Sequence, residues 1–301
     1  MVIISSCSIL SALRRPRVAL SRLVARLLRI IGGTPWGPSL IFFMRRHSLT
    51  RRALGWSLGV FGTFANLAEA EEYVSRYVPT GHEDPTEHNR QVAKAETTRE
   101  SDYPMLFFLA PIKAEIRSVF DLGGGIGNLF YLLDSHLDFS EELLWTIYEL
   151  PLKKESILDF ARSKGERRVA FTENFQQASG VDLFVAVGAL HYFEPALPDL
   201  LRDLSQLPRH VMINRSPFSS GDDIVTVQDY KYWVFPCKLH SATKLASGMR
   251  ELGYELVASW SVHERRLSVP LHPERKAPYQ GFYFRLLMTT RPSSTQLNTE
   301  A

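Results

Sequence analysis

The sequence has 301 residues, of which 45% are hydrophobic and 22% are charged, a composition that excludes a disordered chain. Its two cysteines form no C-x-x-C motif and no His/Cys cluster at metal spacing, which argues against a disulfide scaffold and a metal site. The formal net charge is +3, yet residues 1–68 hold ten arginines and no lysine or acid, so subtracting +10 from +3 leaves −7 for residues 69–301.

Residues 1–57 are predicted to form a basic N-terminal extension. Its charge favours a polyanionic neighbour, either a membrane surface or a nucleic acid. Residues 18–31 place leucine, valine and isoleucine on one helical face and arginine on the other, as in a helix that lies in a membrane interface. A helix packed on the body, or a leader upstream of a later start at Met44, would carry the same pattern.

No membrane-spanning segment is predicted. The longest uncharged stretch, Ala53 to Ala68, contains three glycines and falls short of the roughly 18 apolar residues that a span requires. At the N-terminus the apolar residues precede the basic ones, which is the reverse of a secretory signal. We therefore expect a cytoplasmic protein whose membrane association, if it has one, is peripheral and runs through residues 1–57.

The body of the chain is predicted to be one α/β domain over residues 58–290, followed by a flexible polar tail over 291–301. Helical patterns precede the sheet, at 69–77 and 91–116. Strands are then predicted at 118–123, 143–150, 167–172, 181–188, 209–216, 254–262 and 281–289, and helices at 128–136, 152–164, 195–205 and 241–252. This alternation predicts a mostly parallel sheet with helices on both faces. The last two strands follow each other without a helix, so one is expected to be antiparallel.

The segment VFDLGGGIGN carries the main functional signal. A buried strand delivers Asp121, and Gly123, Gly125 and Gly127 then allow a tight turn in which the backbone can approach a ligand. The pattern D-x-G-x-G-x-G is the first motif of class I methyltransferases, which bind S-adenosylmethionine. The nicotinamide fingerprint G-x-G-x-x-G would require a small residue at position 128, where Asn128 stands. The sequence therefore predicts S-adenosylmethionine as the cofactor, although three glycines also occur in purely structural turns.

Two further segments are predicted to bind this cofactor. The strand LLWTIYEL ends in Glu149, 22 residues past Gly127, where a carboxylate can accept both ribose hydroxyls. A carboxylate at this position could equally cap the next helix. After the following strand, Asn174 and Phe175 lie where methyltransferases recognise adenine, although a loop asparagine is more often a turn residue.

The strand at 181–188 leads into GALHYFEP, which is expected near the methyl group that is transferred. Methyl transfer to an oxygen or nitrogen usually requires loss of a proton, and His191 is the candidate general base because an imidazole titrates near neutrality. The alternative is that His191 only lines the pocket. Tyr192, Arg215 and Gln228 are the candidate acceptor-binding residues, because loops at this edge of such a sheet carry specificity. Arg215 could instead pair with Glu194.

The ordered blocks GVFGTFANLAEAEEYV, SDYPMLFFL, VFDLGGGIGN, VDLFVAVGALHYFEP, INRSPF, VTVQ and GYEL resemble a family of methyltransferases known mostly from bacterial surface-polysaccharide gene clusters. The resemblance covers roughly residues 58–288. It implies a seven-stranded, Rossmann-like class I methyltransferase sheet with one antiparallel strand. It also implies that Asp121, the three glycines and Glu149 are cofactor ligands. The acceptor of that family is not established. The sequence Ala65-Asn66-Leu67 departs from its opening pattern, and residues 1–55 lie outside it.

The function predicted from these observations is methyl transfer from S-adenosylmethionine to an oxygen, less readily a nitrogen, of a small molecule or glycan precursor. Three alternatives remain open at this point. A non-catalytic binding module would keep the fold as a scaffold. A nucleic-acid methyltransferase would explain the arginines, but the body is acidic and the D/N-P-P-Y/F signature is missing from the sequence. A nicotinamide oxidoreductase is disfavoured by Asn128.

Overall fold

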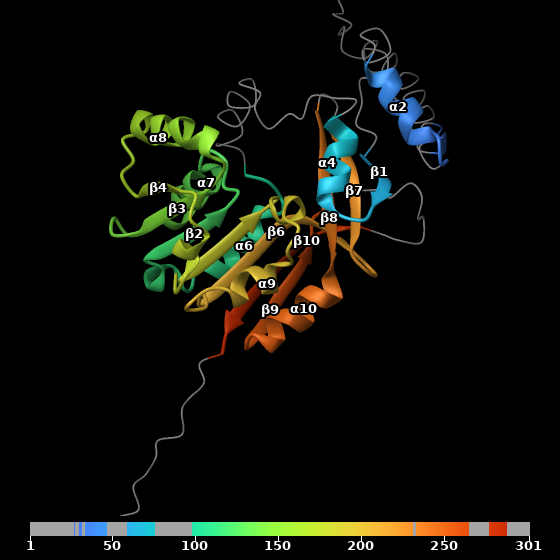
Figure 1. Cartoon of the computed structure of the whole chain (residues 1–301). Helices are drawn as coiled ribbons and strands as arrows, with labels where there is room; N and C mark the ends of the chain where they lie inside the picture. The colour runs from blue at the N-terminus through green and yellow to red at the C-terminus, as the bar shows by residue number, and fades with distance from the viewer. Residues whose placement is uncertain are drawn as a thin grey trace, which may run out of the picture.

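The structure is a computed structural model of the chain, and it describes residues 27, 30–31, 34–46, 59–75, 98–230, 233–264 and 277–287 (Figure 1). Most of the predicted helix at 18–31 and the whole of the predicted tail at 291–301 therefore lie outside the described residues. Within the part of the chain that is described, no helix combines the length and the apolar character needed to cross a bilayer.

The described elements alternate along the chain, as the sequence predicts for residues beyond 118. The strands are β1 (Gly59–Phe64), β2 (Ser118–Leu122), β3 (Leu144–Tyr148), β4 (Val169–Thr172), β5 (Leu183–Val187), β6 (His210–Ser219), β7 (Ile224–Tyr230), β8 (Trp233–Ser241), β9 (Tyr254–Ser261) and β10 (Tyr279–Leu286). The α-helices are α2 (Gly37–Arg46), α4 (Leu67–Ser75), α6 (Asp102–Leu109), α7 (Asn128–Leu137), α8 (Lys154–Ser163), α9 (Leu197–Arg202) and α10 (Ala242–Glu251). Short 3-10 helices are η1 (Lys113–Glu115), η2 (Pro151–Lys153), η3 (Phe175–Ala178) and η4 (Leu190–Tyr192).

Seven strands form the predicted sheet, in the order β4-β3-β2-β5-β6-β10-β9. The first five run parallel, and β10 is antiparallel to both of its neighbours, β6 and β9. The prediction of a mostly parallel seven-stranded sheet with one antiparallel strand, the class I methyltransferase arrangement, is confirmed. Strand β5 is buried along most of its length, as expected for a central parallel strand covered on both faces.

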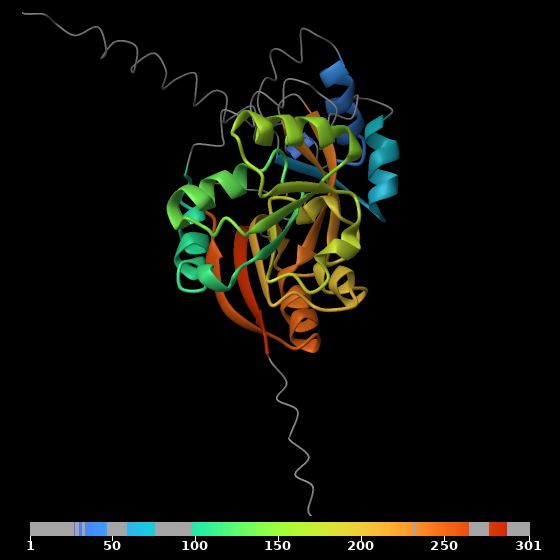
Figure 2. The same cartoon turned by 90° about the vertical axis from the view of Figure 1, so that its left-hand side faces the viewer.

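Helices cover both faces of this sheet (Figures 1 and 2). Alternate side chains of each strand point to opposite faces, so the core divides into two clusters. One cluster joins the strands to α6, α7 and α8 and contains Trp145, Phe130 and Met105. The other joins them to η3, α9 and α10 and contains Phe120 and Phe184.

Three further strands extend the sheet, and the sequence patterns did not predict them. Strands β1, β7 and β8 form an antiparallel unit in the order β1-β7-β8, which meets the main sheet where β8 runs parallel to the end of β6. Helix α4 packs on this unit through Ala70 and Val74, which contact Val225 and Val227 of β7. Gln228, which the sequence analysis expected on a loop at the edge of the sheet, therefore lies in a β-hairpin formed by β7 and β8.

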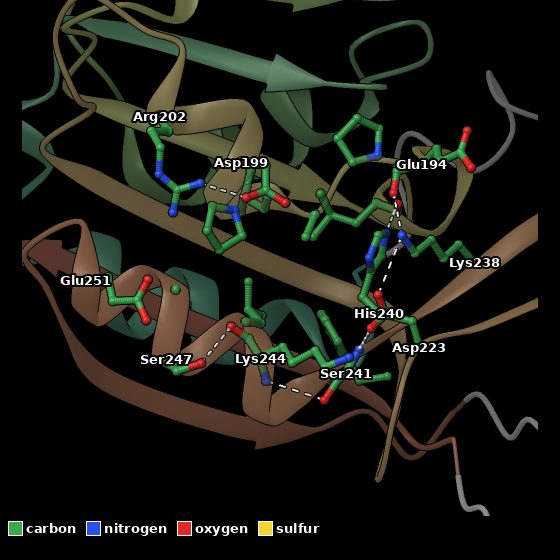
Figure 3. A pocket seen from close by; sticks show the side chains of 18 residues that line it. Glu194, Asp199, Arg202, Asp223, Lys238, His240, Ser241, Lys244, Ser247 and Glu251 are labelled. Atoms are coloured by element: carbon green, nitrogen blue, oxygen red, sulfur yellow. Dashed lines mark hydrogen bonds and ion pairs between the residues drawn. The ribbon is translucent and has the colours of Figure 1, made fainter. Parts of the chain in front are cut away.

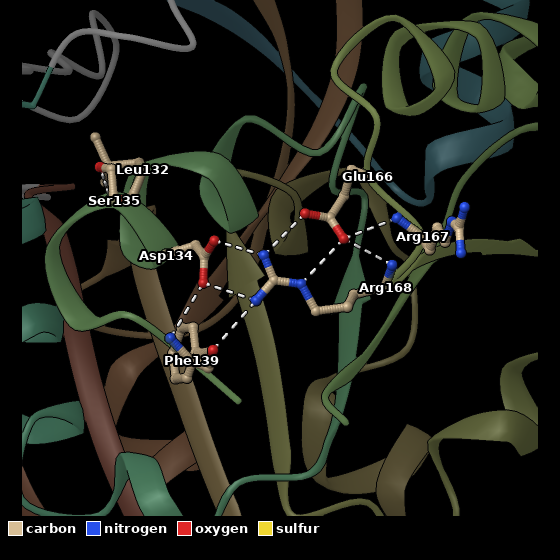
Figure 4. Close-up of polar contacts among 7 residues, drawn as sticks. All are labelled: Leu132, Asp134, Ser135, Phe139, Glu166, Arg167 and Arg168. Carbon is tan, nitrogen blue, oxygen red and sulfur yellow. Dashed lines mark hydrogen bonds and ion pairs between the residues drawn. The ribbon is translucent and has the colours of Figure 1, made fainter. Parts of the chain in front are cut away.

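A partly buried ionic cluster joins α7 to the start of β4 (Figure 4). The Arg168 guanidinium, whose side chain is 10% exposed, donates to Asp134 at 2.7 Å and to Glu166 at 2.8 Å. It also donates to the carbonyl of Phe139 at 3.2 Å and lies 5.0 Å from the ring centre of Phe130. Both carboxylates share one cation, so the cluster joins the helix end, the following loop and the strand.

Candidate active site

The carboxyl ends of the central strands meet along one edge of the sheet. Leu122 at the end of β2 lies in register with Tyr148 of β3 and with Ala186 of β5, and Val187 of β5 lies in register with Asn214 of β6. The residues that follow these strands therefore form a row along that edge. Ligands of open parallel sheets bind at this edge, where neighbouring connections leave in different directions.

The glycine turn between β2 and α7 adopts a backbone that other residues resist. Gly123, Gly125 and Gly127 have φ angles of 66°, 61° and 88°, in the left-handed region. A Cβ on Gly123 would lie 2.6 Å from the Cβ of Ala189, and a Cβ on Gly124 would lie 2.5 Å from the Asp121 carboxylate. The turn therefore excludes side chains, and it packs directly against the segment that follows β5.

Asp121 lies beneath this turn and is 1% exposed. Its carboxylate accepts a hydrogen bond from the indole Nε1 of Trp145 at 3.0 Å. Burial raises the pKa of Asp121 to about 7, the Trp145 bond opposes the rise, and Glu149 and Arg215 act in opposite directions. A cofactor bound on the turn would therefore contact the backbone that Asp121 supports, and it would lie near the charge of the Asp121 carboxylate. Trp145, which fixes this carboxylate, carries no motif that would have revealed its role from sequence.

Glu149 follows β3, next to the glycine turn. The backbone N–H of Gly123 donates to the carbonyl of Tyr148 at 2.8 Å, which joins the turn to the residue just before Glu149. The carboxylate is half-buried, and it accepts a hydrogen bond from the N–H of Leu150 at 3.2 Å. Burial raises the pKa of Glu149, while the Leu150 N–H lowers it. A carboxylate in this position can accept hydrogen bonds from a ligand's hydroxyl groups.

Asn174 and Phe175, the predicted adenine contacts, follow β4 on the far side of β3. The side-chain oxygen of Asn174 accepts a hydrogen bond from the N–H of Gln176 at 3.0 Å and so caps η3. The ring of Phe175 is half-buried and lies 5.6 Å from Phe120 and 5.9 Å from Tyr148, in edge-on contacts. Both side chains therefore have structural partners, and their contact with adenine stays a prediction.

His191 and Tyr192 lie in η4, which follows β5. His191 is 1% exposed, and its ring centre lies 4.1 Å from that of Tyr192. Gly123 packs against Ala189, the residue just before η4, and His191 lies two residues further along the chain. The sheet thus brings the candidate base close to the candidate cofactor turn.

Tyr192 and Gln228 are brought together, although they are distant in sequence. The Tyr192 hydroxyl donates to the Gln228 side chain at 3.5 Å, and the Gln228 amide donates to the hydroxyl of Tyr279 at 2.9 Å. These three residues come from η4, β7 and β10, so they join the added hairpin to the main sheet. Tyr279 was not among the residues predicted from sequence, because it lies in a strand that carries no motif.

Arg215 lies in β6, directly after Asn214, the last residue of β6 that pairs with β5. Its φ angle of 50° is unusual for a residue with a side chain. Its guanidinium donates to Asp102 at 2.6 Å; the Asp102 side chain is almost fully buried, and that of Arg215 is 12% exposed. The sequence left open whether Arg215 pairs with an acceptor or with Glu194, and the structure places Asp102, from the first turn of α6, against the guanidinium. Asp102 occurs in the SDYPMLFFL block, which is the only sequence signal that pointed to it.

A separate cleft of about 300 Å³ lies beside η4, between α9, α10 and β8 (Figure 3). Its lining includes Glu194, Arg202, Lys238, His240 and Lys244, and none of the predicted site residues. The His240 Nε2 donates to the carbonyls of Leu190 and Phe193, at 3.3 and 3.0 Å, and Lys238 donates to the carbonyl of Glu194 at 2.7 Å. Strand β8 therefore holds η4 from both ends.

Among the described residues, no group of three or more histidine, cysteine or acidic side chains is arranged to hold a metal ion.

No protein-family model matches the sequence, and no curated protein is detectably similar to it. Solved structures are similar in chain arrangement. A 1,6-didemethyltoxoflavin-N1-methyltransferase from Burkholderia thailandensis, with bound S-adenosylhomocysteine, is 19% identical over 75% of this chain and 94% of its own, with a TM-score of 0.45. The CcbJ methyltransferase from Streptomyces caelestis is 13% identical over 64% of this chain and 92% of its own, with a TM-score of 0.41.

A third structure is the N-terminal domain of EvdMO1, obtained in the presence of S-adenosylhomocysteine and D-fucose. It is 10% identical over 69% of this chain and 100% of its own, with a TM-score of 0.46. These similarities concern the arrangement of the chain and assign no residue role. The resemblance to the family from polysaccharide gene clusters stays a prediction.

Proposed function

We propose that residues 58–290 form an S-adenosylmethionine-dependent methyltransferase domain that transfers a methyl group to an oxygen of a small molecule or glycan precursor. The observation that carries the proposal is the left-handed glycine turn between β2 and α7, joined by a hydrogen bond to Tyr148, the last residue of β3, which directly precedes Glu149. The backbone of the turn gives a ligand close access, and Glu149 offers a carboxylate for its hydroxyls. The strand order supports the same fold-level function.

In this proposal each group has one task. The turn at Gly123 to Gly127 supports the methionine end of the cofactor, with the charge of Asp121 beneath it, and Glu149 accepts hydrogen bonds from the ribose. Asn174 and Phe175 lie beyond β3, on the side proposed for adenine. The acceptor hydroxyl attacks the methyl carbon as the carbon–sulfur bond breaks and the sulfur takes the electron pair. His191 takes the hydroxyl proton, which leaves the methyl ether and S-adenosylhomocysteine.

The acceptor side supports a neutral, hydroxyl-bearing substrate. Tyr192, Gln228 and Tyr279 join hydroxyl and amide groups in one hydrogen-bonded chain, in which Gln228 and Tyr279 are buried. The charge of Arg215 is compensated by the buried carboxylate of Asp102. Groups of this kind hydrogen-bond alcohols, and aromatic rings with polar ends suit amphipathic or sugar-like molecules.

Titration calorimetry with S-adenosylmethionine and with S-adenosylhomocysteine tests the cofactor site. We expect Glu149→Ala to weaken binding roughly 10- to 100-fold, because charge-assisted hydrogen bonds to the ribose are lost. Glu141→Ala is the matched control, since Glu141 is exposed and lies before β3, at the opposite end of that strand from Glu149. Equal effects of the two substitutions would contradict the assignment of Glu149.

A second pair of variants tests the turn itself. Gly125→Arg places a long side chain in the left-handed turn and is expected to abolish binding of both compounds. Gly221→Arg is the control, because a Cβ at Gly221 meets no atom within 4 Å. Retained binding and turnover by Gly125→Arg would contradict the site.

Turnover, measured with an isotopically labelled methyl donor and a panel of glycan precursors, tests the candidate base. His191→Gln should lower turnover roughly 10²-fold or more while cofactor binding persists. Binding without turnover on any acceptor would favour the non-catalytic binding module.

A further inference from the structure

Helix α2 carries an apolar stripe that faces solvent. Leu40 and Phe43 lie three residues apart on one side of the helix, and Trp36, the residue just before α2, continues this side because its carbonyl accepts a hydrogen bond from the N–H of Leu40 at 3.2 Å. The side chains of Trp36, Leu40 and Phe43 are 62%, 38% and 58% exposed. Large apolar side chains that line up on an exposed helix face mark a surface that contacts another apolar phase.

The described residues just before α2 continue this character. Leu27 and Ile30 are 50% and 63% exposed. Hydrogen bonds connect Ile31 to the start of α2, because the N–H of Thr34 donates to the carbonyl of Ile31 at 2.9 Å and the N–H of Gly37 donates to the carbonyl of Thr34 at 3.0 Å. In both overall views α2 lies at the side of the molecule where β1 and α4 lie (Figures 1 and 2).

The charge of this part of the chain is of one sign. Ten arginines and no acid occur in residues 1–68, and Arg45 and Arg46 end α2 itself. Residues 69–301 carry about −7, so an anionic surface attracts the N-terminal part and repels the body. The charge therefore selects a partner that is polyanionic and also orients the chain on it.

We propose that α2 docks on an anionic lipid bilayer, with Trp36, Leu40 and Phe43 entering the interface and the arginines lying among acidic headgroups. Stable attachment to a bilayer takes two signals, an apolar one and a basic one, and this segment carries both. Tryptophan favours the depth at which headgroups meet acyl chains. A nucleic acid would use the arginines but leave the apolar stripe in water. This proposal goes beyond methyl transfer and does not depend on it.

Vesicle flotation of the full chain tests the proposal, with vesicles of phosphatidylcholine alone and of phosphatidylcholine mixed with phosphatidylglycerol. We expect binding to the mixed vesicles only, and weaker binding at high salt because exposed charges are screened. The triple variant Trp36→Ser/Leu40→Ser/Phe43→Ser should bind at least about tenfold more weakly, because the buried apolar area is lost. The variant Arg45→Gln/Arg46→Gln should reduce the salt-sensitive part of the binding.

The matched control replaces exposed apolar residues of the body, in the variant Phe107→Ser/Leu144→Ser/Leu256→Ser. It should bind vesicles like the unaltered chain, and thermal unfolding should show that both triple variants fold. Equal loss in the two triple variants would overturn the proposal. The proposal would also be overturned if the chain failed to bind vesicles but bound duplex DNA in a salt-dependent way, and the serine variant of α2 kept that DNA binding. Cofactor binding, measured separately by calorimetry, distinguishes failure here from failure of the methyltransferase proposal.

Discussion

At the residue scale, the electrostatics of the candidate site are set by Asp121, a carboxylate with almost no exposure. Its position under the glycine turn shields it from water, and this burial raises its pKa to about 7. This carboxyl group is therefore neutral in one part of the physiological pH range and charged in another. It gives the site a pH-dependent charge next to the place proposed for a cationic cofactor.

The raised pKa predicts how stability changes with pH. Between the ordinary value of 3.8 and about 7, the unfolded chain ionises Asp121 while the folded chain keeps its proton. The stability from this group is therefore fully present below pH 3.8 and is lost as the pH rises towards 7. Asp121→Asn removes this loss and keeps an oxygen for Trp145. The free energy of unfolding of Asp121→Asn minus that of the unaltered protein should therefore increase by roughly 2–4 kcal/mol as the pH rises through this range.

Urea unfolding at a series of pH values checks this prediction. Asp203→Asn, at an exposed position, serves as the control and should follow the unaltered protein. Parallel profiles for Asp121→Asn and the unaltered protein would show that the buried group is ionised throughout.

Sequence patterns pointed to Asp121, the glycines and Glu149 as candidate cofactor ligands, because strand ends and glycine spacing are local features. They did not identify Trp145 or Asp102, which reach the site from elements distant in sequence. A hydrogen bond between β2 and β3, or an ion pair between α6 and β6, follows from packing that no single segment encodes.

At the element scale, the β7–β8 hairpin supports the segment that carries the candidate base. Two side chains on the same face of β8, Lys238 and His240, donate hydrogen bonds to carbonyls at both ends of η4. Since both partners of the His240 Nε2 are carbonyl oxygens, this nitrogen carries the proton. Burial lowers the pKa of His240 and so favours the neutral ring. The neutral ring is sufficient to donate from Nε2 to the two carbonyls.

Hydrogen exchange in η4 tests the role of β8. His240→Leu removes a donor shared by two buried carbonyls, which should cost roughly 1–3 kcal/mol and open η4 locally. The amides of Tyr192 and Phe193, which close this turn, should exchange faster while those of β2 and β5 are unchanged. His240→Gln keeps a side-chain N–H and should restore much of the protection. Uniform acceleration over the whole chain would instead indicate a general loss of stability.

The hairpin itself escaped prediction for physical reasons. Strand β7 mixes valines with Thr226 and Gln228, which are buried through hydrogen bonds and packing in the assembled sheet. Strand β8 contains Pro236, a residue that removes a ladder hydrogen bond and that argues against a strand when it is met in a sequence. By contrast, β2 and β5 are short apolar segments bounded by glycine, and their patterns predicted them correctly.

At the scale of the whole molecule, the core consists of two hydrophobic clusters, one on each face of the sheet, and it contains few charged side chains. The Arg168 cluster is the largest exception, with one guanidinium shared by Asp134 and Glu166. Removing only the cation leaves two largely buried carboxylates without compensation, and this is more damaging than removing an exposed pair.

Arg168→Met is therefore expected to lower the free energy of unfolding by roughly 2–4 kcal/mol. Arg162→Met is the matched control, because Arg162 pairs with Asp159 at the surface and an exposed pair contributes at most about 1 kcal/mol. Urea denaturation of the two variants measures the difference. Equal losses would show that the cluster contributes no more than a surface ion pair.

A crystal structure with bound S-adenosylhomocysteine tests the central claim most directly. We expect the methionine portion against the backbone of Gly123 to Gly127 and the ribose hydroxyls within hydrogen-bond distance of the Glu149 carboxylate. Density for the compound in the cleft beside α10, or a glycine turn filled by the protein's own atoms while the compound is excluded, would contradict it.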